Sequence, residues 1–463
     1  MSLLPIVNLA SNSTFNSGDF NVTWSIVFGI LIVLVILLLS NVLRRAIPFL
    51  RKSLLPVAFI GGAIGLGLKI AFQYSEVAIT GLNVYTDGFK AMLQVITYHS
   101  LAVGFIALGL KTVSKERVKS KEMGRDSVKG GIIIVGSYLL QAIIGVTATI
   151  LLSLVFTTIV PYAGVILPLG FGQGPGQAMT WGSNYELLGF TGGTDFGITI
   201  STMGFLSAAV GGVIYLNYAA KKGYVKRRDE SENAPQSDEL VEKHGEVPLS
   251  ESIDKLTIQV ALIAIVYLLT FAIIYPLSLI PVAFIKNTLA PLLFGFNFII
   301  GTMIAMLVKK LLAAMQKKNV VKKQYINNFM LERIAGLAFD VMIISSIMAI
   351  DIRNLADTGL IVTLAIICVI GAFATFFYVK HMTSRAFPGY KHQGFVTFYG
   401  NLTGTASDGI ALLREIDPTF KTPSADSLVY GSTVAIALSF PVLLIVGYIH
   451  GGGNNTDRKS TRL

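Results

Sequence analysis

The sequence predicts an all-α polytopic membrane protein with about ten transmembrane helices in two inverted five-helix repeats, each with a glycine-rich re-entrant loop. Three observations predict this fold. Of the 463 residues, 53% are hydrophobic and 14% are charged, whereas about a quarter of an ordinary soluble domain is charged. Apolar runs of about 20 residues recur along the chain, and each is long enough to cross roughly 30 Å of hydrocarbon. Basic residues gather in short clusters between these runs.

The apolar runs define ten expected spans. They cover residues 24–42, 54–72, 92–110, 130–156, 196–219, 256–279, 289–312, 334–350, 360–379 and 428–449. The connectors after the odd-numbered spans hold 28 of the 37 lysines and arginines. Because such loops stay on the cytoplasmic side, we expect these connectors in the cytoplasm. An even number of spans then places both tails, residues 1–23 and 451–463, outside.

The formal net charge of +11 does not predict nucleic-acid binding, because the basic residues form no continuous face. They are explained as determinants of membrane topology. The single cysteine, Cys368, lies in an apolar run, so neither an intramolecular disulfide nor a thiolate metal cage is possible.

A charged, polar segment divides the chain into two halves. Residues 221–255 are poor in aromatic residues and predict a flexible cytoplasmic linker. On either side lie five expected spans, within residues 24–220 and 256–450. Since five is odd, the second half is expected upside down relative to the first, as in inverted-repeat transporters.

The connection between the fourth and fifth spans contains a segment that a continuous helix cannot tolerate. Residues 166–193 read ILPLGFGQGPGQAMTWGSNYELLGFTGG. Inside a helix, glycine costs about 1 kcal/mol and proline about 3 kcal/mol relative to alanine. Broken backbone at membrane depth needs protein or a water-filled cavity to supply hydrogen-bond partners, so we expect a re-entrant loop that lines a cavity. Trp181 and Tyr185 are expected to anchor this loop at the membrane interface.

The second half repeats this feature between the ninth and tenth spans. Residues 394–413 read GFVTFYGNLTGTASDGIALL. In the topology above, this loop enters from the cytoplasm and the first loop enters from outside. Their tips are therefore expected near the bilayer midplane. The alternative is that both segments are ordinary surface loops, which are often rich in glycine.

The paired broken segments predict two kinds of binding group, one for an anionic substrate and one for a cation. Free N–H groups at helix N-termini bind a carboxylate, whereas carbonyl and hydroxyl oxygens bind a small cation. The expected substrate-binding residues are Gly172, Gln173, Gly174, Gly176, Gln177, Thr180, Gly400, Asn401 and Gly404. The expected cation-coupling residues are Asp340, Thr403, Thr405, Ser407 and Asp408.

Asp340 enters this list because it lies within an apolar helix, about seven residues from its start. A carboxylate at that depth is costly unless it is paired, neutralised or bound to a cation, so function is the default interpretation. Pairing with Arg333, seven residues earlier on the same helical face, is the structural alternative.

Both glycine-rich segments resemble motifs of one family. GFGQGPGQA from Gly170 and YGNLTGTASDGIA from Tyr399 are similar to the two re-entrant motifs of bacterial sodium/glutamate symporters. The resemblance continues into FTGGTDFGITISTMGFLSAAVGGVI from Phe190 and ERIAGLAFDVMIISSIMAIDIRNL from Glu332.

This resemblance implies sodium-coupled uptake of glutamate, with Na⁺ as the coupling ion. It also implies a homodimer in the bacterial cytoplasmic membrane, each protomer moving a substrate-carrying domain against a scaffold. The chain departs from the family pattern at Gln173, where histidine is usual, and at Asp408, where an apolar or hydroxyl residue is usual. These departures concern the substrate rather than the transporter class, and a di- or hydroxycarboxylate such as citrate is the alternative.

Other classes of protein are less well supported. The sequence has no phosphate-binding Walker loop, no metal-spaced His/Cys cluster and no Gly-x-Ser-x-Gly elbow, so we expect neither an enzyme nor an ATP-driven pump. An intramembrane aspartyl protease would need two facing aspartates, and its Gly-x-Gly-Asp signature is absent. An anion channel is a further alternative.

Overall fold

All of the secondary structure that is described is helical. The computed structural model describes residues 22–52, 55–73, 87–111, 121–186, 189–226, 254–282, 285, 290–295, 297–320, 325–417, 421–432, 434–435 and 438–439. Within these ranges there is no β-strand. Residues 1–21 of the first expected tail, the second tail, most of the linker at 221–255 and most of the tenth expected span at 428–449 lie outside the described residues.

Most of the described residues belong to helices that follow one another along the chain. They are α2 (Val22–Ala46), α3 (Pro48–Lys52), α4 (Val57–Gln73), α5 (Asp87–Leu110), α7 (Lys121–Ser153), η2 (Pro161–Val165), α8 (Ile166–Gly172), α9 (Pro175–Glu186), α10 (Gly193–Lys221), α11 (Lys255–Ser278), α12 (Ala290–Gly295), α13 (Asn297–Lys317), α14 (Asn328–Ala349), η5 (Ile352–Leu355), α15 (Thr358–Ala386), η6 (Pro388–Tyr390), α16 (Lys391–Thr403) and α17 (Ala406–Arg414). Asp254, Asn327 and Asp357 begin α11, α14 and α15 by accepting hydrogen bonds from backbone N–H groups of the first turn.

Seven of the described helices are long and apolar enough to cross a membrane. Their spanning parts are Gly29–Ala46, Phe89–Leu110, Gly124–Ser153, Gly193–Lys221, Lys255–Ser278, Asn297–Lys317 and Thr358–Ala386. The second expected span coincides with the shorter apolar helix α4, and the eighth coincides with α14. The protein is therefore an all-α membrane protein, as the composition predicts.

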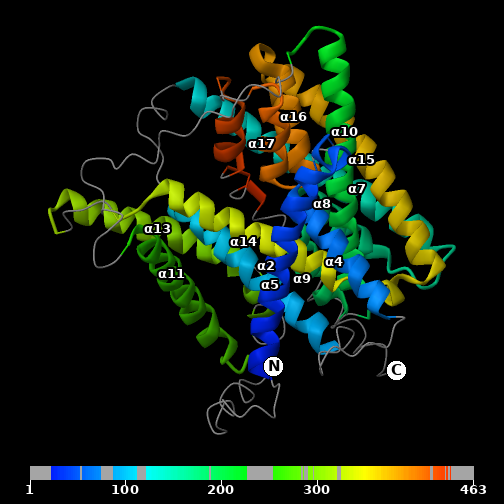
Figure 1. The fold of residues 1–463 in the computed structure, drawn as a ribbon, viewed down its shortest axis with the longest axis horizontal. Coiled ribbons are helices and arrows are strands. Elements are labelled where there is room, and N and C mark those ends of the chain that lie inside the picture. Colours follow the sequence, from blue (N-terminus) through cyan, green and yellow to red (C-terminus); the bar gives the residue numbers. More distant parts are fainter. Residues whose placement is uncertain are drawn as a thin grey trace.

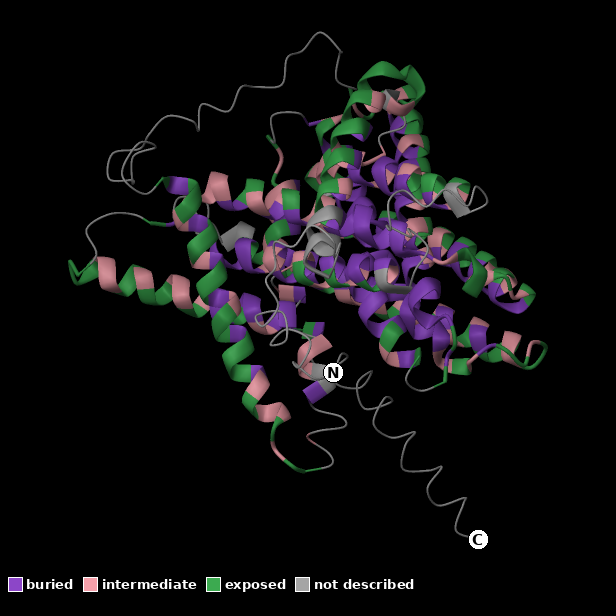
Figure 2. Ribbon diagram, turned by 60° about the horizontal axis from the view of Figure 1, so that its bottom comes forward, coloured by how far each residue is buried: buried purple, intermediate pink, exposed green. Residues whose placement is uncertain are grey.

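Large apolar side chains lie on the outer faces of these helices. Leu38, Leu268, Leu307 and Phe377 are each more than 60% exposed. Figure 2 shows buried positions gathered toward the middle of the molecule, with exposed positions along the outer helices. Exposed apolar surface on this scale is expected where a protein faces lipid.

The helices pack into two groups that share an interface. In the scaffold group, α2, α4, α5, α11, α13 and α14 contact one another. In the hairpin group, α7 to α10 and α15 to α17 contact one another. Figure 1 shows α11 and α13 on one side of the molecule and α7, α10, α15, α16 and α17 on the other. Contacts of α5 and α14 with α9, and of α14 with α10, join the groups.

Candidate functional site

The first glycine-rich segment folds into a helical hairpin. Helix α8 runs antiparallel to α7, because Gly164 packs against Gly145 while the Tyr138 hydroxyl donates to the Gly172 carbonyl at 3.0 Å. The helix breaks at Gln173 and Gly174, and Gly174 has φ of +89°, which favours glycine. The chain then continues into α9.

Helix α9 returns along α10. Gly182 packs against Gly193, and Gly197 packs against the carbonyl of Ala178, so α9 and α10 are antiparallel. Gly170 of α8 approaches Ser201 farther along α10. The first hairpin therefore starts near the beginning of α10, advances along it and turns back.

The second glycine-rich segment forms a hairpin from α16 and α17. The break lies at Gly404 and Thr405, and Gly400 packs closely against Gly409 across it. Helix α16 is antiparallel to α10, since Tyr215 packs on Phe395 while Tyr399, four residues later, donates to the Ser207 carbonyl. This hairpin thus approaches from the far end of α10.

The tips of the two hairpins meet beside Gly204 of α10. A Cβ atom there would overlap the Thr403 carbonyl oxygen and lie 3.1 Å from Cδ1 of Phe171. A Cβ atom on Gly174 would likewise lie 3.7 Å from Cγ2 of Thr405. The two breaks predicted from the sequence therefore lie together, and α9 and α17 both begin at their meeting point.

The predicted substrate-binding residues surround this meeting point. Gly172, Gln173, Gly174 and Gly404 lie at the breaks, Gly176, Gln177 and Thr180 lie in the first turns of α9, and Gly400 and Asn401 lie in the last turn of α16. Gln177 is 1% exposed, and neither atom of its amide has a hydrogen-bond partner among the described residues. The Thr180 hydroxyl donates to the Gly176 carbonyl at 2.9 Å. Gln177 is therefore a buried polar side chain with unused bonding capacity.

Asp408 is tied to the start of α17. Its Oδ2 atom accepts hydrogen bonds from the Thr405 N–H at 2.7 Å and from the Thr405 hydroxyl at 2.8 Å. The Thr403 hydroxyl donates within its own helix, to the Tyr399 carbonyl at 2.7 Å. The side chain of Ser407 lies outside the described residues. Asp408 therefore caps a helix as well as bringing a carboxylate to the meeting point.

Asp340 of α14 forms no hydrogen bond or ion pair with any residue that the structure describes. Its charge is close enough to Asp408 for the two carboxylates to repel each other. Arg333 does not pair with it, and instead lies 4.9 Å from the centre of the Phe329 ring. The two aspartates singled out from the sequence therefore interact electrostatically.

Trp181 and Tyr185 do not lie where the sequence predicted them. Both are at most 2% exposed, and they pack against each other in the core, with Tyr162 against Tyr185. The prediction that they anchor a loop at the membrane interface is therefore wrong. They belong to α9, whose face is covered by neighbouring helices.

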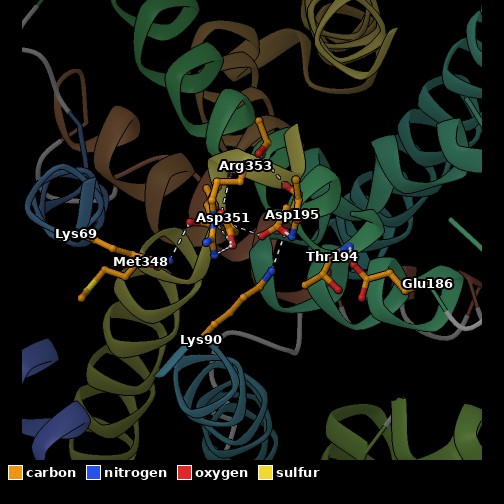
Figure 3. A network of polar contacts seen from close by, with 11 residues as sticks. Lys69, Lys90, Glu186, Thr194, Asp195, Met348, Asp351 and Arg353 are labelled. Atoms are coloured by element: carbon orange, nitrogen blue, oxygen red, sulfur yellow. Dashed lines mark hydrogen bonds and ion pairs between the residues drawn. The ribbon is translucent and has the colours of Figure 1, made fainter. Parts of the chain in front are cut away.

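A buried carboxylate that the sequence analysis missed lies at the start of α10. Asp195 is 0% exposed, and its oxygens accept from Lys90 Nζ at 2.7 Å, Asn354 Nδ2 at 2.8 Å and the Asp351 N–H at 2.9 Å. Figure 3 shows Lys90 and Asp351 converging on it from different elements. We call Asp195 and these three donors the Asp195 clamp. It joins the hairpin group to the scaffold group.

Neighbouring charges extend the clamp. Lys69 Nζ donates to the Met348 and Ile350 carbonyls at 3.1 Å each, at the end of α14. Arg353 forms an ion pair with Asp351 at 2.6 Å, and its hydrogen bonds lower the pKa of Asp351 to about 2. An aspartate two residues beyond a glycine pair, at the start of an apolar span, is the sequence signal that would have pointed to Asp195.

The comparisons with known proteins add no family. No model of a known protein family matches the chain, and no curated protein matches it either.

Proposed function

We propose that the protein is a secondary transporter that binds a small anionic substrate between the two hairpin tips and carries it across the membrane together with sodium. The observation that carries the proposal is the meeting of two broken segments, from opposite ends of α10, at Gly204. Broken helices that meet inside the membrane are the usual construction of a transporter binding site.

The start of α9 supplies the anion-binding groups. The first N–H groups of a helix have no partner inside it, and the helix dipole adds partial positive charge there. Gly176 and Gln177 occupy these positions in α9. The side-chain amide of Gln177 also has no hydrogen-bond partner among the described residues. A carboxylate would accept from these donors.

The two aspartates explain why the anion would travel with a cation. Asp340 and Asp408 interact as like charges, and an anion brought close to them is repelled more strongly than in bulk water, because the effective dielectric constant is lower. A sodium ion bound by these carboxylates and by the hydroxyl of Thr405 reverses the sign of that interaction. Coupling between the two solutes would follow.

Glutamate is the proposed substrate and sodium the proposed ion, because the two motifs resemble those of sodium/glutamate symporters. A hydroxycarboxylate such as citrate is the alternative. The order of elements supports an inverted repeat, since each half contains three longer helices with one short helix among them, then a fourth long helix and then a hairpin. The hairpin group would move against the scaffold group, in a homodimer with both termini outside.

An intramembrane protease is less well supported than a transporter. Its two catalytic aspartates would have to share a water molecule between free carboxyl oxygens. Here Oδ2 of Asp408 accepts two hydrogen bonds from Thr405 at the start of α17.

The test is uptake by the purified protein in liposomes. We expect saturable uptake of labelled glutamate under an inward sodium gradient, and none when choline replaces sodium or when the liposomes lack the protein. Saturable uptake of citrate alone would select the alternative substrate. Current that does not saturate would indicate a channel, and no coupled flux with any carboxylate would overturn the proposal.

A further inference from the structure

Helix α7 contacts the carbonyl ends of both broken helices. Tyr138 donates to the Gly172 carbonyl at the end of α8, at 3.0 Å. Three residues later, Gln141 donates through Nε2 to the Leu402 carbonyl at the end of α16, also at 3.0 Å. One face of α7 therefore lies against the ends of both helices.

The orientation of the Gln141 amide leaves its oxygen unused. Both hydrogens of Nε2 have acceptors, because Thr375 Oγ1 lies at 2.9 Å in addition to the Leu402 carbonyl. Rotating the amide by 180° would bring two oxygens together at Leu402, so Oε1 is the free atom. Gln141 is 0% exposed, and Oε1 has no hydrogen-bond donor among the described residues.

Ser137 brings a second unused oxygen to the same face of α7. It precedes Gln141 by four residues, which places the two side chains together on one side of the helix. A buried serine in a helix usually donates to the carbonyl four residues earlier. Here the Ile133 carbonyl accepts from the Tyr378 hydroxyl at 3.3 Å, and Ser137 Oγ is fully buried without a described partner.

The surroundings favour a positive ligand. The last carbonyl groups of α16 carry partial negative charge and lack partners inside the helix. Thr375 and Tyr378 of α15 face this part of α7 with neutral hydroxyls. Lys380, the next basic residue along α15, is exposed and lies over the Tyr218 ring. Neutral oxygens in a buried site suit a small monovalent cation.

We infer that Ser137 Oγ and Gln141 Oε1 form a sodium site at the carbonyl end of α16, separate from the Asp340 and Asp408 pair. The role of this site in coupling rests on the proposed function, but binding of the ion does not. An ion here would hold the end of α16 against α7. It would thus order the tip of the second hairpin before the substrate arrives.

The test measures sodium binding without substrate or flux. The full chain in lipid nanodiscs is unfolded by heat while NaCl replaces choline chloride at constant ionic strength. We expect the unfolding midpoint of the wild type to rise with sodium. Half of the maximal increase in midpoint is reached at a certain sodium concentration. Ser137→Ala should make this concentration about tenfold higher, as expected when one of a few ligands is lost.

Thr363→Val is the matched control. Thr363 is also fully buried with a hydroxyl that has no described partner, but it lies twelve residues from Thr375 along α15. Its sodium dependence should equal that of the wild type. Gln141→Leu is a second variant. It also loses the hydrogen bonds to Thr375 and Leu402, so its sodium dependence, and not its midpoint without sodium, is compared with that of the wild type.

The inference is overturned if Ser137→Ala and Gln141→Leu both respond to sodium as Thr363→Val does, or if the wild type does not distinguish sodium from choline. A shifted response in Ser137→Ala, in a protein that transports no carboxylate, would support this site and refute the proposed function.

Discussion

The carboxylate of Asp408 lies where a structural role and a functional role overlap. Its two hydrogen bonds from Thr405 close the first turn of α17, as a helix cap does. The same carboxylate interacts electrostatically with that of Asp340. The two roles respond differently to substitution, because a cap needs an oxygen acceptor and a cation site needs a charge.

We therefore expect Asp408→Asn and Asp408→Ala to separate the roles. Asparagine keeps an acceptor, so its midpoint of thermal unfolding should stay near that of the wild type, whereas alanine should lower stability by about 0.5–2 kcal/mol. In uptake assays, Asp408→Asn should raise the sodium concentration for half-maximal rate more than it raises the KM for substrate. The opposite ranking, or unchanged sodium dependence in both Asp408→Asn and Asp340→Asn, would make these aspartates structural.

Gly204 is the residue at which both hairpin tips touch α10. Any side chain there meets the Thr403 carbonyl, which is backbone and cannot swing away. We expect Gly204→Ala to separate the tips, to destabilise the protein by about 1–3 kcal/mol and to abolish uptake. Thermal unfolding and uptake in liposomes measure the two effects.

Gly67→Ala in α4 is the control for Gly204→Ala. A Cβ atom on Gly67 meets nothing within 4 Å, so alanine should leave stability unchanged or raise it by about 0.5–1 kcal/mol. If Gly204→Ala behaved like Gly67→Ala, the tips would not be in contact as described.

At the scale of elements, the Asp195 clamp ties α10 to α5 and to the connection after α14. Breaking a buried ion pair by removing one partner costs about 3–5 kcal/mol, because the other charge stays buried. The side chain of Lys90 is 18% exposed, whereas that of Asp195 is fully buried. The two partners should therefore not be equivalent.

We expect Asp195→Ala to destabilise the protein more than Lys90→Met, because the lysine can reach water whereas the other two donors would lose a buried acceptor. The double variant should be more stable than the sum of the single effects predicts. Thermal unfolding of all four proteins measures this coupling. Purely additive effects would show that Lys90 and Asp195 do not interact.

The sequence predicted local features of these elements better than long-range contacts. The breaks at Gly174 and Gly404 follow from glycine and proline costs within one segment, so composition is sufficient to find them. Lys90 and Asp195 are 105 positions apart, and nothing in either segment indicates the other. The predicted position of Trp181 at the membrane interface was wrong for the same reason, since its burial depends on which helices cover α9.

At the scale of the molecule, the helical fold and its membrane character were predictable because they depend on composition and on the length of apolar runs. Individual boundaries were not. Helix α7 begins at Lys121 and α5 at Asp87, both earlier than the expected spans, because a helix continues past the apolar part of its sequence into polar surroundings. Ser137 and Gln141 were overlooked because neutral polar residues in a span carry no distinctive pattern.

Topology can be tested by cysteine labelling in intact cells. We expect Ser237→Cys in the linker to react with an impermeant maleimide after permeabilisation only, and the exposed Ala356→Cys between α14 and α15 to react without it. The native Cys368 is 2% exposed, so it should give little background. Labelling of Ser237→Cys from outside would reverse the orientation inferred from the basic residues.

The position of Gly204 along α10 has an electrical consequence. Eleven residues separate it from Gly193 and seventeen from Lys221, or about 17 Å and 26 Å at 1.5 Å per residue. For a helix near the membrane normal and centred on roughly 30 Å of hydrocarbon, the meeting point lies about 10 Å below one face. A monovalent ion that enters from that face crosses about a third of the transmembrane voltage, which corresponds to about 0.8 kcal/mol per 100 mV. The affinity of the meeting point for this ion would then depend on the membrane potential. The dependence would be weaker for an ion that enters from the nearer face than for one that enters from the opposite face.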